Sequence, residues 1–323
     1  MVLITTKITL LKNAYAKPEM KFMVKIELYT SDEKRYFGGF TVPYEKAKYV
    51  ILGVPFEHSL TYKTGTSLAP TRIREASDAI ESFSLRANFD YDKCPVADLG
   101  DISVVPGDPM QTFNRISEVV SDIVASGKIP ILIGGEHSIT YGIIRGLREK
   151  SPCTLVFDAH FDSRDNYLGY KLSHASIMRR IMEIIGTRKI MFLGVRAFSE
   201  EEYLFIRSKN VRYVTSMQML RNTVGNILKP VKSFLSECRS VHISIDMDVF
   251  DPAYAPGVDN PEPEGLIPTL IFDILYNIVD EKLLSLDVVE VSPIIDVNDV
   301  TSLLAAKVIK EAITYHYVKT ISK

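Results

Sequence analysis

Short runs rich in Val, Ile, Leu and Phe recur along the chain and alternate with longer amphipathic segments. Such runs predict β-strands, and apolar residues spaced every three to four positions predict α-helices. The predicted strands are 49–54, 130–133, 154–157, 190–195, 211–214, 241–245 and 283–288. The predicted helices are 71–84, 112–125, 141–149, 174–185, 200–208, 222–235, 268–278 and 301–320. Nearly continuous apolar strands flanked by helices indicate an α/β fold of three layers, with a mainly parallel sheet covered by helices on both faces.

The domain organisation follows from the absence of repeats, low-complexity segments and linker-like stretches. We expect a single catalytic domain over residues 45–323, preceded by an N-terminal extension over residues 1–44. Within the extension, the segment VKIELYTSDEKRYFGGF is expected to form an extra hairpin at the edge of the sheet. Internal methionines leave Met1, Met20 or Met23 as the start of the protein.

Composition and charge exclude several classes of protein. The 323 residues include 38 Lys and Arg against 40 Asp and Glu, a net charge of −2, and no basic run occurs. We therefore expect no nucleic-acid partner. The longest apolar stretches, such as 129–133, are far shorter than the roughly 20 residues that span a bilayer. The first residues, interrupted by lysines, lack the pattern of a signal peptide, so we expect no membrane partner.

Three cysteines, Cys94, Cys153 and Cys238, lie far apart, and no Cys-x-x-Cys pair occurs. Their small, odd number predicts neither a disulfide framework nor a cysteine zinc site. A reducing, cytoplasmic setting is the simplest interpretation.

Polar clusters follow three of the predicted strands, at the strand ends where open α/β sheets bind their ligands. The first is Gly-Gly-Glu-His-Ser at residues 134–138. Two interpretations stay open for this segment. It is a glycine turn in which Glu136 or Ser138 caps the following helix, or His137 is a ligand, since a neutral imidazole can bind a metal near neutral pH.

The second and third clusters concentrate carboxylates. Asp158, His160 and Asp162 follow one strand at positions i, i+2 and i+4, and Asp246 and Asp248 follow another at i and i+2. In extended backbone, side chains spaced by two lie on one side of the chain, so each set is expected to converge. Like charges held so closely are costly unless a cation neutralises them.

The charge count of the clusters points to metal ions. Four carboxylates balance two divalent cations, and together with two imidazoles they can serve two ions only if some carboxylates bridge. Oxygen and imidazole ligands without sulfur favour Mn²⁺, Fe²⁺, Co²⁺ or Zn²⁺ over Ca²⁺. Paired metals about 3.5–4 Å apart provide hydroxide at neutral pH. The residues alone therefore indicate a two-metal hydrolase.

Taken together, these segments resemble the ureohydrolase family, which includes arginase and agmatinase, and are most similar to its agmatinase-type members. The resemblance extends from Tyr49 to Tyr317 and rests on GVPFEHSLTYKTGTSLAPTRIREAS, IGGEHS, DAHFDSRD, LSHASIMRRI, SIDMDVFDPAYAPGV, DVVEVSPIID and TSLLAAKVI. It implies an arginase-like fold, two Mn²⁺ ions, hydrolysis of a guanidino C–N bond and a homo-oligomer, either a trimer or a hexamer.

The resemblance also implies a ligand set for each ion. One ion would be held by His137, Asp158, Asp162 and Asp246. The other would be held by Asp158, His160, Asp246 and Asp248, so that Asp158 and Asp246 bridge. A hydroxide between the ions would attack the guanidinium carbon, and the tetrahedral intermediate would collapse to urea and an amine.

Two further residues gain roles from the resemblance or from their position. His174 falls on the family's loop histidine, to which the family assigns proton transfer. Glu290 follows the last predicted strand. It either supports the metal ligands from behind or satisfies loop amides, and both interpretations stay open.

One departure from the family pattern concerns the substrate. Relatives carry Gly-Leu-Ser/Thr, two residues and then a glutamate that pairs with the guanidinium, whereas residues 265–270 here read GLIPTL and place Leu270 at the glutamate position. Losing such a charge-assisted bond costs about 1.5–3 kcal/mol unless another group replaces it. The acidic candidates nearby are Glu262, Glu264 and Asp273.

The expected reaction is hydrolysis of agmatine to putrescine and urea, a step of polyamine biosynthesis. The alternatives within the class are an arginase, a guanidino-acid hydrolase and a formimidoylglutamate hydrolase, the last of which would need a cationic residue for its substrate. An alternative of another class is a catalytically silent homologue that serves in binding or assembly. A nucleotide-binding module is excluded, because IGGEHS lacks the phosphate-loop pattern.

Overall fold

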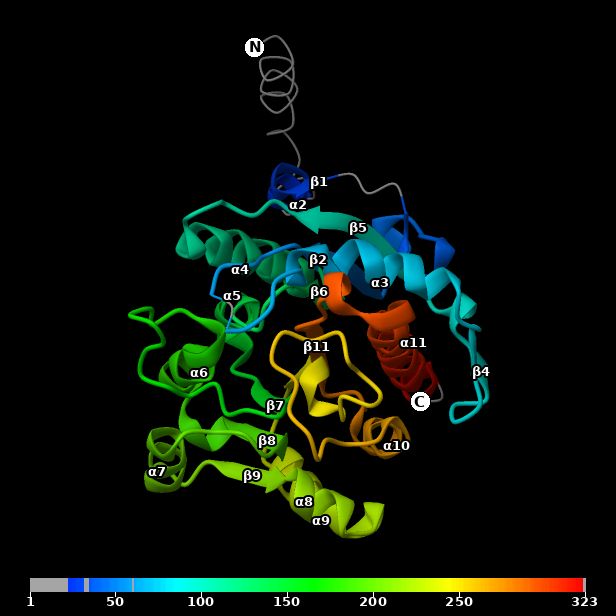
Figure 1. Cartoon of the computed structure of the whole chain (residues 1–323). Coiled ribbons are helices and arrows are strands. Elements are labelled where there is room, and N and C mark those ends of the chain that lie inside the picture. Colours follow the sequence, from blue (N-terminus) through cyan, green and yellow to red (C-terminus); the bar gives the residue numbers. More distant parts are fainter. Residues whose placement is uncertain (1–22, 32–34, 60, 322–323) are drawn as a thin grey trace.

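A computed structural model describes residues 23–31, 35–59 and 61–321. Its centre is a sheet of nine strands in the order β1-β5-β2-β6-β11-β10-β7-β8-β9 (Figure 1). The strands are β1 (Thr30–Ser31), β2 (Tyr49–Val54), β5 (Val96–Ile102), β6 (Ile129–Gly134), β7 (Cys153–Phe157), β8 (Ile190–Val195), β9 (Arg212–Thr215), β10 (Val241–Asp246) and β11 (Leu283–Val289). All neighbours are parallel except β1, which pairs antiparallel with β5 at the edge. A separate two-stranded sheet joins β3 (Phe83–Ser84) and β4 (Phe89–Asp90).

Helices cover both faces of the large sheet (Figure 1). One face carries α4 (Pro109–Ala125), α5 (Ile139–Gly146), α6 (Ile177–Ile185) and α7 (Glu200–Ser208). The other carries α3 (Ala69–Asp78), α9 (Val224–Ser236), α10 (Pro268–Ile278) and α11 (Val300–Ile321), and the short helix α8 (Ser216–Leu220) follows β9. Among the described residues, no helix is long and apolar enough to span a bilayer. The three-layer α/β fold predicted from the sequence is confirmed.

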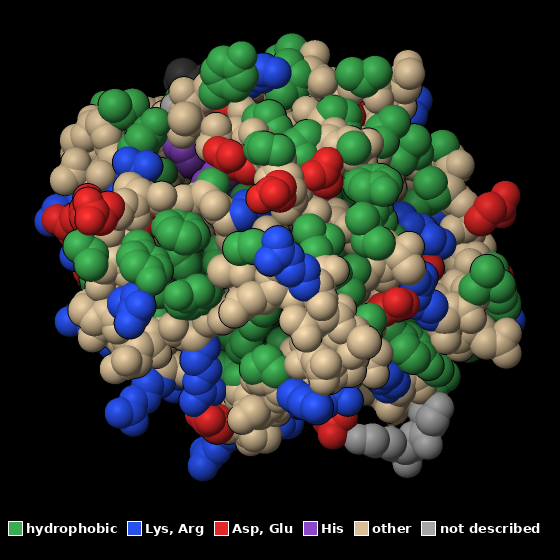
Figure 2. Space-filling model, turned by 60° about the horizontal axis from the view of Figure 1, so that its bottom comes forward, with side chains coloured by type: hydrophobic (Ala, Val, Ile, Leu, Met, Phe, Trp, Pro, Cys, Tyr) green, Lys and Arg blue, Asp and Glu red, His purple; other side chains and the backbone are tan. Residues whose placement is uncertain are grey.

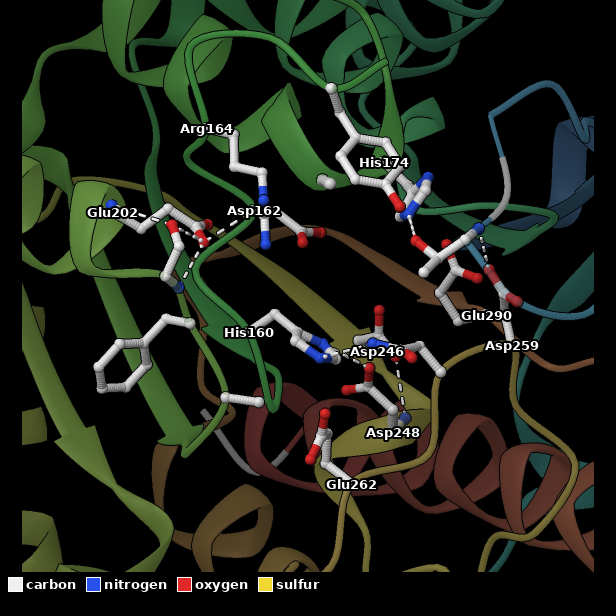
Figure 3. Close-up of a pocket in the computed structure, with 17 residues that line it drawn as sticks. His160, Asp162, Arg164, His174, Glu202, Asp246, Asp248, Asp259, Glu262 and Glu290 are labelled. Atoms are coloured by element: carbon white, nitrogen blue, oxygen red, sulfur yellow. Dashed lines mark hydrogen bonds and ion pairs between the residues drawn. The ribbon is translucent and has the colours of Figure 1, made fainter.

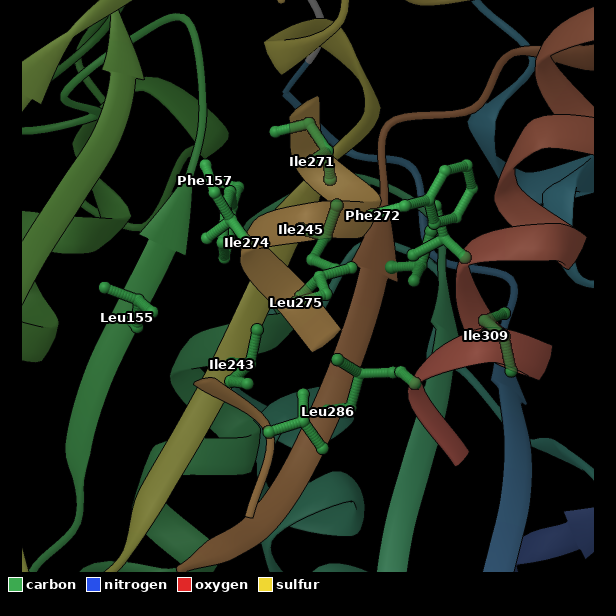
Figure 4. Close-up of a cluster of buried hydrophobic side chains, with 14 of the residues drawn as sticks. Leu155, Phe157, Ile243, Ile245, Ile271, Phe272, Ile274, Leu275, Leu286 and Ile309 are labelled. Atoms are coloured by element: carbon green, nitrogen blue, oxygen red, sulfur yellow. The ribbon is translucent and has the colours of Figure 1, made fainter. Parts of the chain in front are cut away.

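Alternate residues of the central strand β2 enter different cores, which is why this strand is apolar on both faces. In β2, Tyr49 and Ile51 pack on the α3 and α11 side, whereas Val50 and Leu52 pack against α4 and α5. Figure 4 shows the first core, where strand residues such as Ile243 meet side chains of α10 and α11. Because both faces are buried, the strand directions and ends are held firmly, and the loops after the strands start from fixed positions.

The strand missing from the sequence prediction is β5, whose sequence VADLGDI contains two aspartates. Asp98 is buried because Arg74 of α3, itself fully buried, donates two hydrogen bonds to its carboxylate at 2.8 and 3.0 Å. Arg74 also donates to Asp101 at 2.7 Å and to the Gly100 carbonyl at 2.9 Å. The apolar pattern fails here since a buried ion pair takes the place of apolar packing.

The expected N-terminal hairpin is wrong for the described part of its segment. Residues Met23–Tyr29 form a helix, α2, and only Thr30–Ser31 extend as the edge strand β1. A buried Ile26 beside the α4 core explains the helix, because its apolar side chain packs inward while its neighbours are exposed or half-buried. The possible starts at Met1 and Met20 lie outside the described residues.

The cysteine expectation also needs correction, because Cys153 and Cys238 form a disulfide across 85 residues of sequence. Cys153 begins β7, and Cys238 precedes β10, its parallel neighbour. Adjacent parallel strands start at the same edge of a sheet, so distant cysteines become neighbours there. The cysteine count therefore no longer argues for a reducing compartment, and the cytoplasmic location stays a prediction.

The buried ion pair gives a test of the fold. Replacing Arg74→Leu leaves the buried carboxylate of Asp98 without its cation, and we expect the free energy of unfolding to fall by about 3–5 kcal/mol. The matched control is Arg72→Leu on the same helix, where the exposed Arg72 pairs with Glu75 at 3.0 Å and the loss should be about 0–1 kcal/mol. Urea unfolding followed by circular dichroism measures both, and equal losses would contradict the assignment.

Candidate functional site

The six predicted ligands come together where three strands end. His137 follows β6, and Asp246 is the last residue of β10, with Asp248 just beyond it. The other three lie after β7, although not in extended backbone as the sequence argument assumed. The chain leaves the strand at Phe157, and Asp162 adopts a left-handed conformation with φ of +45°. The loop aims Asp158 and Asp162 at His137. It also turns His160 toward Asp248 (Figure 3).

Two groups of potential metal ligands result. In the first, the Nδ1 atom of His137 lies 3.1–3.2 Å from one carboxylate oxygen each of Asp158, Asp162 and Asp246. In the second, the Nδ1 atom of His160 lies 2.9 Å from Asp248 and 3.6 Å from Asp158. Asp158 belongs to both groups, as a bridging ligand would. Asp246 joins only the first, so its bridging role stays a prediction.

Glycine is required in the turn that presents His137. A Cβ atom on Gly135 would lie 1.9 Å from the carbonyl oxygen of Phe56, far inside van der Waals contact. The two loops that follow β2 and β6 can therefore run side by side only if residue 135 has no side chain. The segment is the expected glycine turn, and this turn brings His137 to the other candidate ligands. The expected helix cap is wrong, because Ser138 forms no side-chain cap hydrogen bond and Glu136 accepts the backbone N–H groups of His58 and Ser59 instead. The ligand role of His137 stays a prediction.

Hydrogen bonds behind His137 determine which ring nitrogen faces the carboxylates. Ser244 donates its hydroxyl to the buried Asp287 at 2.6 Å, which uses its only hydrogen. The Ser244 oxygen lies 3.0 Å from His137 Nε2, so it must accept a hydrogen from that nitrogen. Nδ1 is left with a lone pair directed at the carboxylates. A carboxylate that orients a histidine from behind is common at metal sites.

The electrostatics of the cluster call for positive charge. His137 Nδ1 and Asp158 Oδ2 are buried, lie 3.2 Å apart and have no hydrogen-bond partner. Burial, reinforced by the charge of Asp158, raises the pKa of Asp162 to about 6. Burial and the charge of Asp248 raise the pKa of Asp246 well above its usual value. A buried His/Asp cluster with orphaned lone pairs fits divalent cations, which would remove this repulsion.

Glu290 supports the His137 loop, which answers the question the sequence left open. Its backbone is left-handed, with φ of +67°, and its buried carboxylate accepts the His137 N–H at 2.5 Å. Burial, followed by the charges of Asp246, Glu136 and Asp259, raises the pKa of Glu290 well above its usual value. Glu290 thus satisfies a loop amide, and that amide belongs to a candidate ligand.

A cavity of about 260 Å³ opens above the cluster. Four of the predicted ligands, together with His174 and Glu290, line it. The lining residues that sequence reasoning missed include Thr61, Arg164, Tyr167, Phe198, Glu202, Asp259 and Asn260. They come from the segments after four different strands, Glu202 from helix α7 and the others from loops, and only the fold brings them together. Thr61, Arg164 and Asp259 lie within or beside motifs already quoted. Figure 2 shows acidic side chains grouped beside a recess in which a histidine is visible.

Of the three acidic candidates for substrate binding, only Glu262 lines this cavity. Asp273 lies on α10 and accepts a hydrogen bond from Arg86 at 2.9 Å. Glu264 is exposed beside a separate groove with Tyr254 and Ile267. Both are therefore corrected, because one helical turn or two residues of loop suffice to redirect a side chain. Leu270 is half-buried, packs against the apolar core and does not line the cavity.

His174 stands at the rim, with hydroxyls on both ring nitrogens. Thr61 Oγ1 lies 2.7 Å from Nε2, and Ser59 Oγ lies 3.2 Å from Nδ1. The aromatic ring of Tyr167 packs edge-on against the imidazole. His174 is not part of either ligand group, so its position agrees with a role other than metal binding.

The comparisons with known proteins agree with this geometry. A sequence model described as the arginase family matches residues 47–314. The chain is 35% identical to the N(1)-aminopropylagmatine ureohydrolase of Thermococcus kodakarensis, over 82% of this chain and 89% of that protein. It is 31% identical to the agmatinase of Bacillus anthracis, over 83% of this chain and 91% of that protein.

Among solved structures, the agmatine ureohydrolase of Thermoplasma volcanium superposes with a TM-score of 0.83 at 35% identity, covering 90% of this chain and 97% of that one. Sequence and fold thus match along nearly the same residues, and these include every strand end that carries a candidate ligand. The chain belongs to the arginase family.

Proposed function

We propose that the protein hydrolyses the guanidino C–N bond of a small cationic substrate, agmatine, to give putrescine and urea with two Mn²⁺ ions. The observation that carries this proposal is the charge of the cavity. Besides the candidate ligands, its lining includes the carboxyl groups of Glu202, Asp259, Glu262 and Glu290. The two relatives described above are named for agmatine hydrolysis or for its N(1)-aminopropyl derivative, both of which carry an amine beyond the guanidino group.

The partners of these carboxylates indicate where the amine of the substrate binds. Asp259 accepts backbone N–H groups of residues 61–63, and Glu202 accepts those of Ser163 and Ser199. The carboxylate of Glu262 has no hydrogen-bond or ion-pair partner within the described ranges, and its side chain is half-buried beside Asp248 (Figure 3). Glu262 is therefore the free acid available to an ammonium group.

A substrate with an anionic tail fits this cavity poorly. Of the described residues that line it, Arg164 is the only lysine or arginine, and its guanidinium already lies 3.5 Å from Glu202. Arginine, guanidino acids and formimidoylglutamate would all place a carboxylate near Glu262 without a free cation to compensate. The same cavity would hold the tail of agmatine without this repulsion.

The chain's own residues would divide the reaction as follows. When bound, two divalent cations would supply an activated water and draw charge from the guanidino group. The six ligands would hold these ions, with Asp158 shared between them. Glu262 would bind the ammonium tail and orient the guanidino carbon toward the cluster. His174 would give a proton to the departing amine. The homo-oligomeric state and the cytoplasmic location stay predictions.

The first prediction concerns metal content. We expect about two Mn²⁺ per chain after loading and dialysis, and loss of both in Asp158→Asn because Asp158 belongs to both ligand groups. His160→Ala should lose only the second ion. The control is Asp251→Asn, whose carboxylate accepts backbone N–H groups of Ala253 and Gly265 outside the cluster. Elemental analysis checks all four proteins, and a wild-type chain without divalent ions would end the proposal.

The second prediction concerns the substrate. Urea should be released faster from agmatine than from N(1)-aminopropylagmatine, arginine or guanidinobutyrate. It should also be released faster than formamide is released from formimidoylglutamate. Glu262→Gln should lower kcat/KM for agmatine by about 10–100-fold, because a charge-assisted bond of about 1.5–3 kcal/mol is lost. The same substitution should change kcat/KM for butylguanidine little, because this compound lacks the amine.

Glu264→Gln is the matched control for Glu262→Gln, since Glu264 is a neighbouring acid that does not line the cavity. If Glu262→Gln lowers kcat/KM equally for agmatine and butylguanidine, the ammonium group does not bind at Glu262. If the protein prefers guanidinobutyrate or arginine, that compound and not agmatine is the substrate. If it turns over none of the compounds, the catalytically silent homologue is favoured.

The third prediction concerns His174. His174→Ala should lower kcat for agmatine by about 10²–10⁴-fold, the usual contribution of general acid–base catalysis, and leave the metal content unchanged. His58→Ala is the matched control, because His58 packs on Phe56 and Tyr170 and does not line the cavity. Steady-state kinetics with elemental analysis decides the point, and a His174 variant with full turnover would rule out the assigned role.

A further inference from the structure

A single loop after β2 controls both ring nitrogens of His174. Ser59 Oγ lies 3.2 Å from Nδ1 and also accepts the His174 backbone N–H at 3.0 Å. Thr61 Oγ1 lies 2.7 Å from Nε2. A neutral imidazole has one hydrogen for its two ring nitrogens, so one of these hydroxyls must accept a hydrogen bond from the ring and the other must donate one to it.

The hydrogen of Ser59 is already committed. Its hydroxyl donates to Glu136 Oε1 at 2.9 Å. Glu136 is fully buried, and its carboxylate also accepts the backbone N–H of His58 and of Ser59, at 2.6 and 2.7 Å, and the hydroxyl of Ser138. Two of these four groups are backbone N–H groups, which can only donate, and we assign the two hydroxyls as donors as well, so that Glu136 acts only as an acceptor. Ser59 therefore has no hydrogen left for the imidazole and must accept one from Nδ1.

We propose that Glu136 and Ser59 are positioning residues that fix the tautomer of His174, with the hydrogen on Nδ1 and the lone pair on Nε2. The catalytic part of this inference rests on the proposed function, whereas the tautomer does not. Nε2 lies on the side of the ring where Thr61, which also lines the cavity, donates its hydroxyl. Nε2 is thus the atom that takes up and releases the proton, and the rotatable Thr61 hydroxyl can donate to it or accept from it.

The comparison with His137 shows that the position of the serine is what selects the nitrogen. There, Asp287 and Ser244 act on Nε2, so that Nδ1 keeps the lone pair for a ligand role. At His174, Glu136 and Ser59 act on Nδ1, so that Nε2 keeps it. The same chain of carboxylate, serine and imidazole therefore gives opposite tautomers in the two histidines.

Two carboxylates, the buried Asp259 and the half-buried Glu57, also hold the loop in place, so the hydroxyls do not depend on the histidine for their positions. Asp259 accepts the backbone N–H of Thr61 and of Tyr62, each at 2.9 Å. Further along, Glu57 accepts those of Gly65 and Ser67 at 2.9 and 3.0 Å. Glu136 holds the amides of His58 and Ser59, so the loop is anchored on both sides of the Thr61 hydroxyl. Ser67 lies in this loop away from His174 and therefore serves as a control.

The tautomer can be observed directly by nitrogen NMR of the full-length protein, labelled with ¹⁵N in histidine and loaded with diamagnetic Zn²⁺. The His174 signals are assigned by their absence in His174→Gln. Once the pH is high enough that the His174 signals no longer change and the ring is neutral, we expect a hydrogen on Nδ1 and none on Nε2. In Ser59→Ala, Nδ1 loses its acceptor, and a hydrogen should appear on Nε2. Ser59→Thr, which keeps the hydroxyl, and Ser67→Ala should resemble the wild type.

Kinetics with Mn²⁺ tests the catalytic part. Ser59→Ala should lower kcat for agmatine by about tenfold or more, up to the loss in His174→Ala, with KM nearly unchanged and an altered pH profile. Ser59→Thr should restore most of the activity, and Ser67→Ala should keep it. The tautomer assignment would be overturned if the wild type carried a hydrogen on Nε2 or on both ring nitrogens of His174. It would also be overturned if the hydrogen stayed on Nδ1 in Ser59→Ala.

The remaining outcomes separate the two proposals. A moved hydrogen with unchanged kcat would overturn the catalytic role of Ser59 but not the tautomer. Absence of hydrolysis of any guanidino compound would contradict the proposed function, and the NMR result would still decide the tautomer.

Discussion

Repulsion among four aspartates at one buried place is the constraint on which the rest of the site depends. Asp158, Asp162, Asp246 and Asp248 are all nearly inaccessible to solvent, and within the described residues no lysine or arginine forms an ion pair with their carboxylates. A cluster of this kind is stable only with cations or protons between the carboxylates. The rigid parallel sheet holds the strand ends that carry them, and the surrounding serines and acids orient the two histidines. The arrangement costs folding energy and is useful for chemistry.

Most of the fold could be predicted because buried parallel strands and amphipathic helices leave clear sequence patterns. Helix α7 and helix α10 begin and end where the pattern places them. The pattern failed where another interaction replaced apolar packing. Strand β5 is stabilised by the buried pair of Arg74 and Asp98, and an apolar period does not reveal a partner 24 residues away. The disulfide escaped for a similar reason, since its cysteines meet only once β7 and β10 pair.

The site divides in the same way. The candidate ligands were evident because each follows an apolar strand, and strand ends converge in a parallel sheet. Substrate-contacting residues were harder to find, because they lie on loops whose course depends on long-range contacts. Glu262 and Glu264 are two residues apart, yet only Glu262 enters the cavity. Ser59 and Glu136 are 77 residues apart, and their contact appears only when the loops after β2 and β6 run side by side.

The disulfide between Cys153 and Cys238 lies at the amino ends of β7 and β10, whereas Asp158 and Asp246 lie at their carboxyl ends. The two strands are thus joined covalently at one end and along a ladder of hydrogen bonds up to Phe157 and Ile245. Metal ions are consequently not needed to keep these ligand-bearing strands together. Exchange of one divalent ion for another becomes a local event at a preformed frame, unlike in small metal-dependent domains, where loss of the ion unfolds the chain.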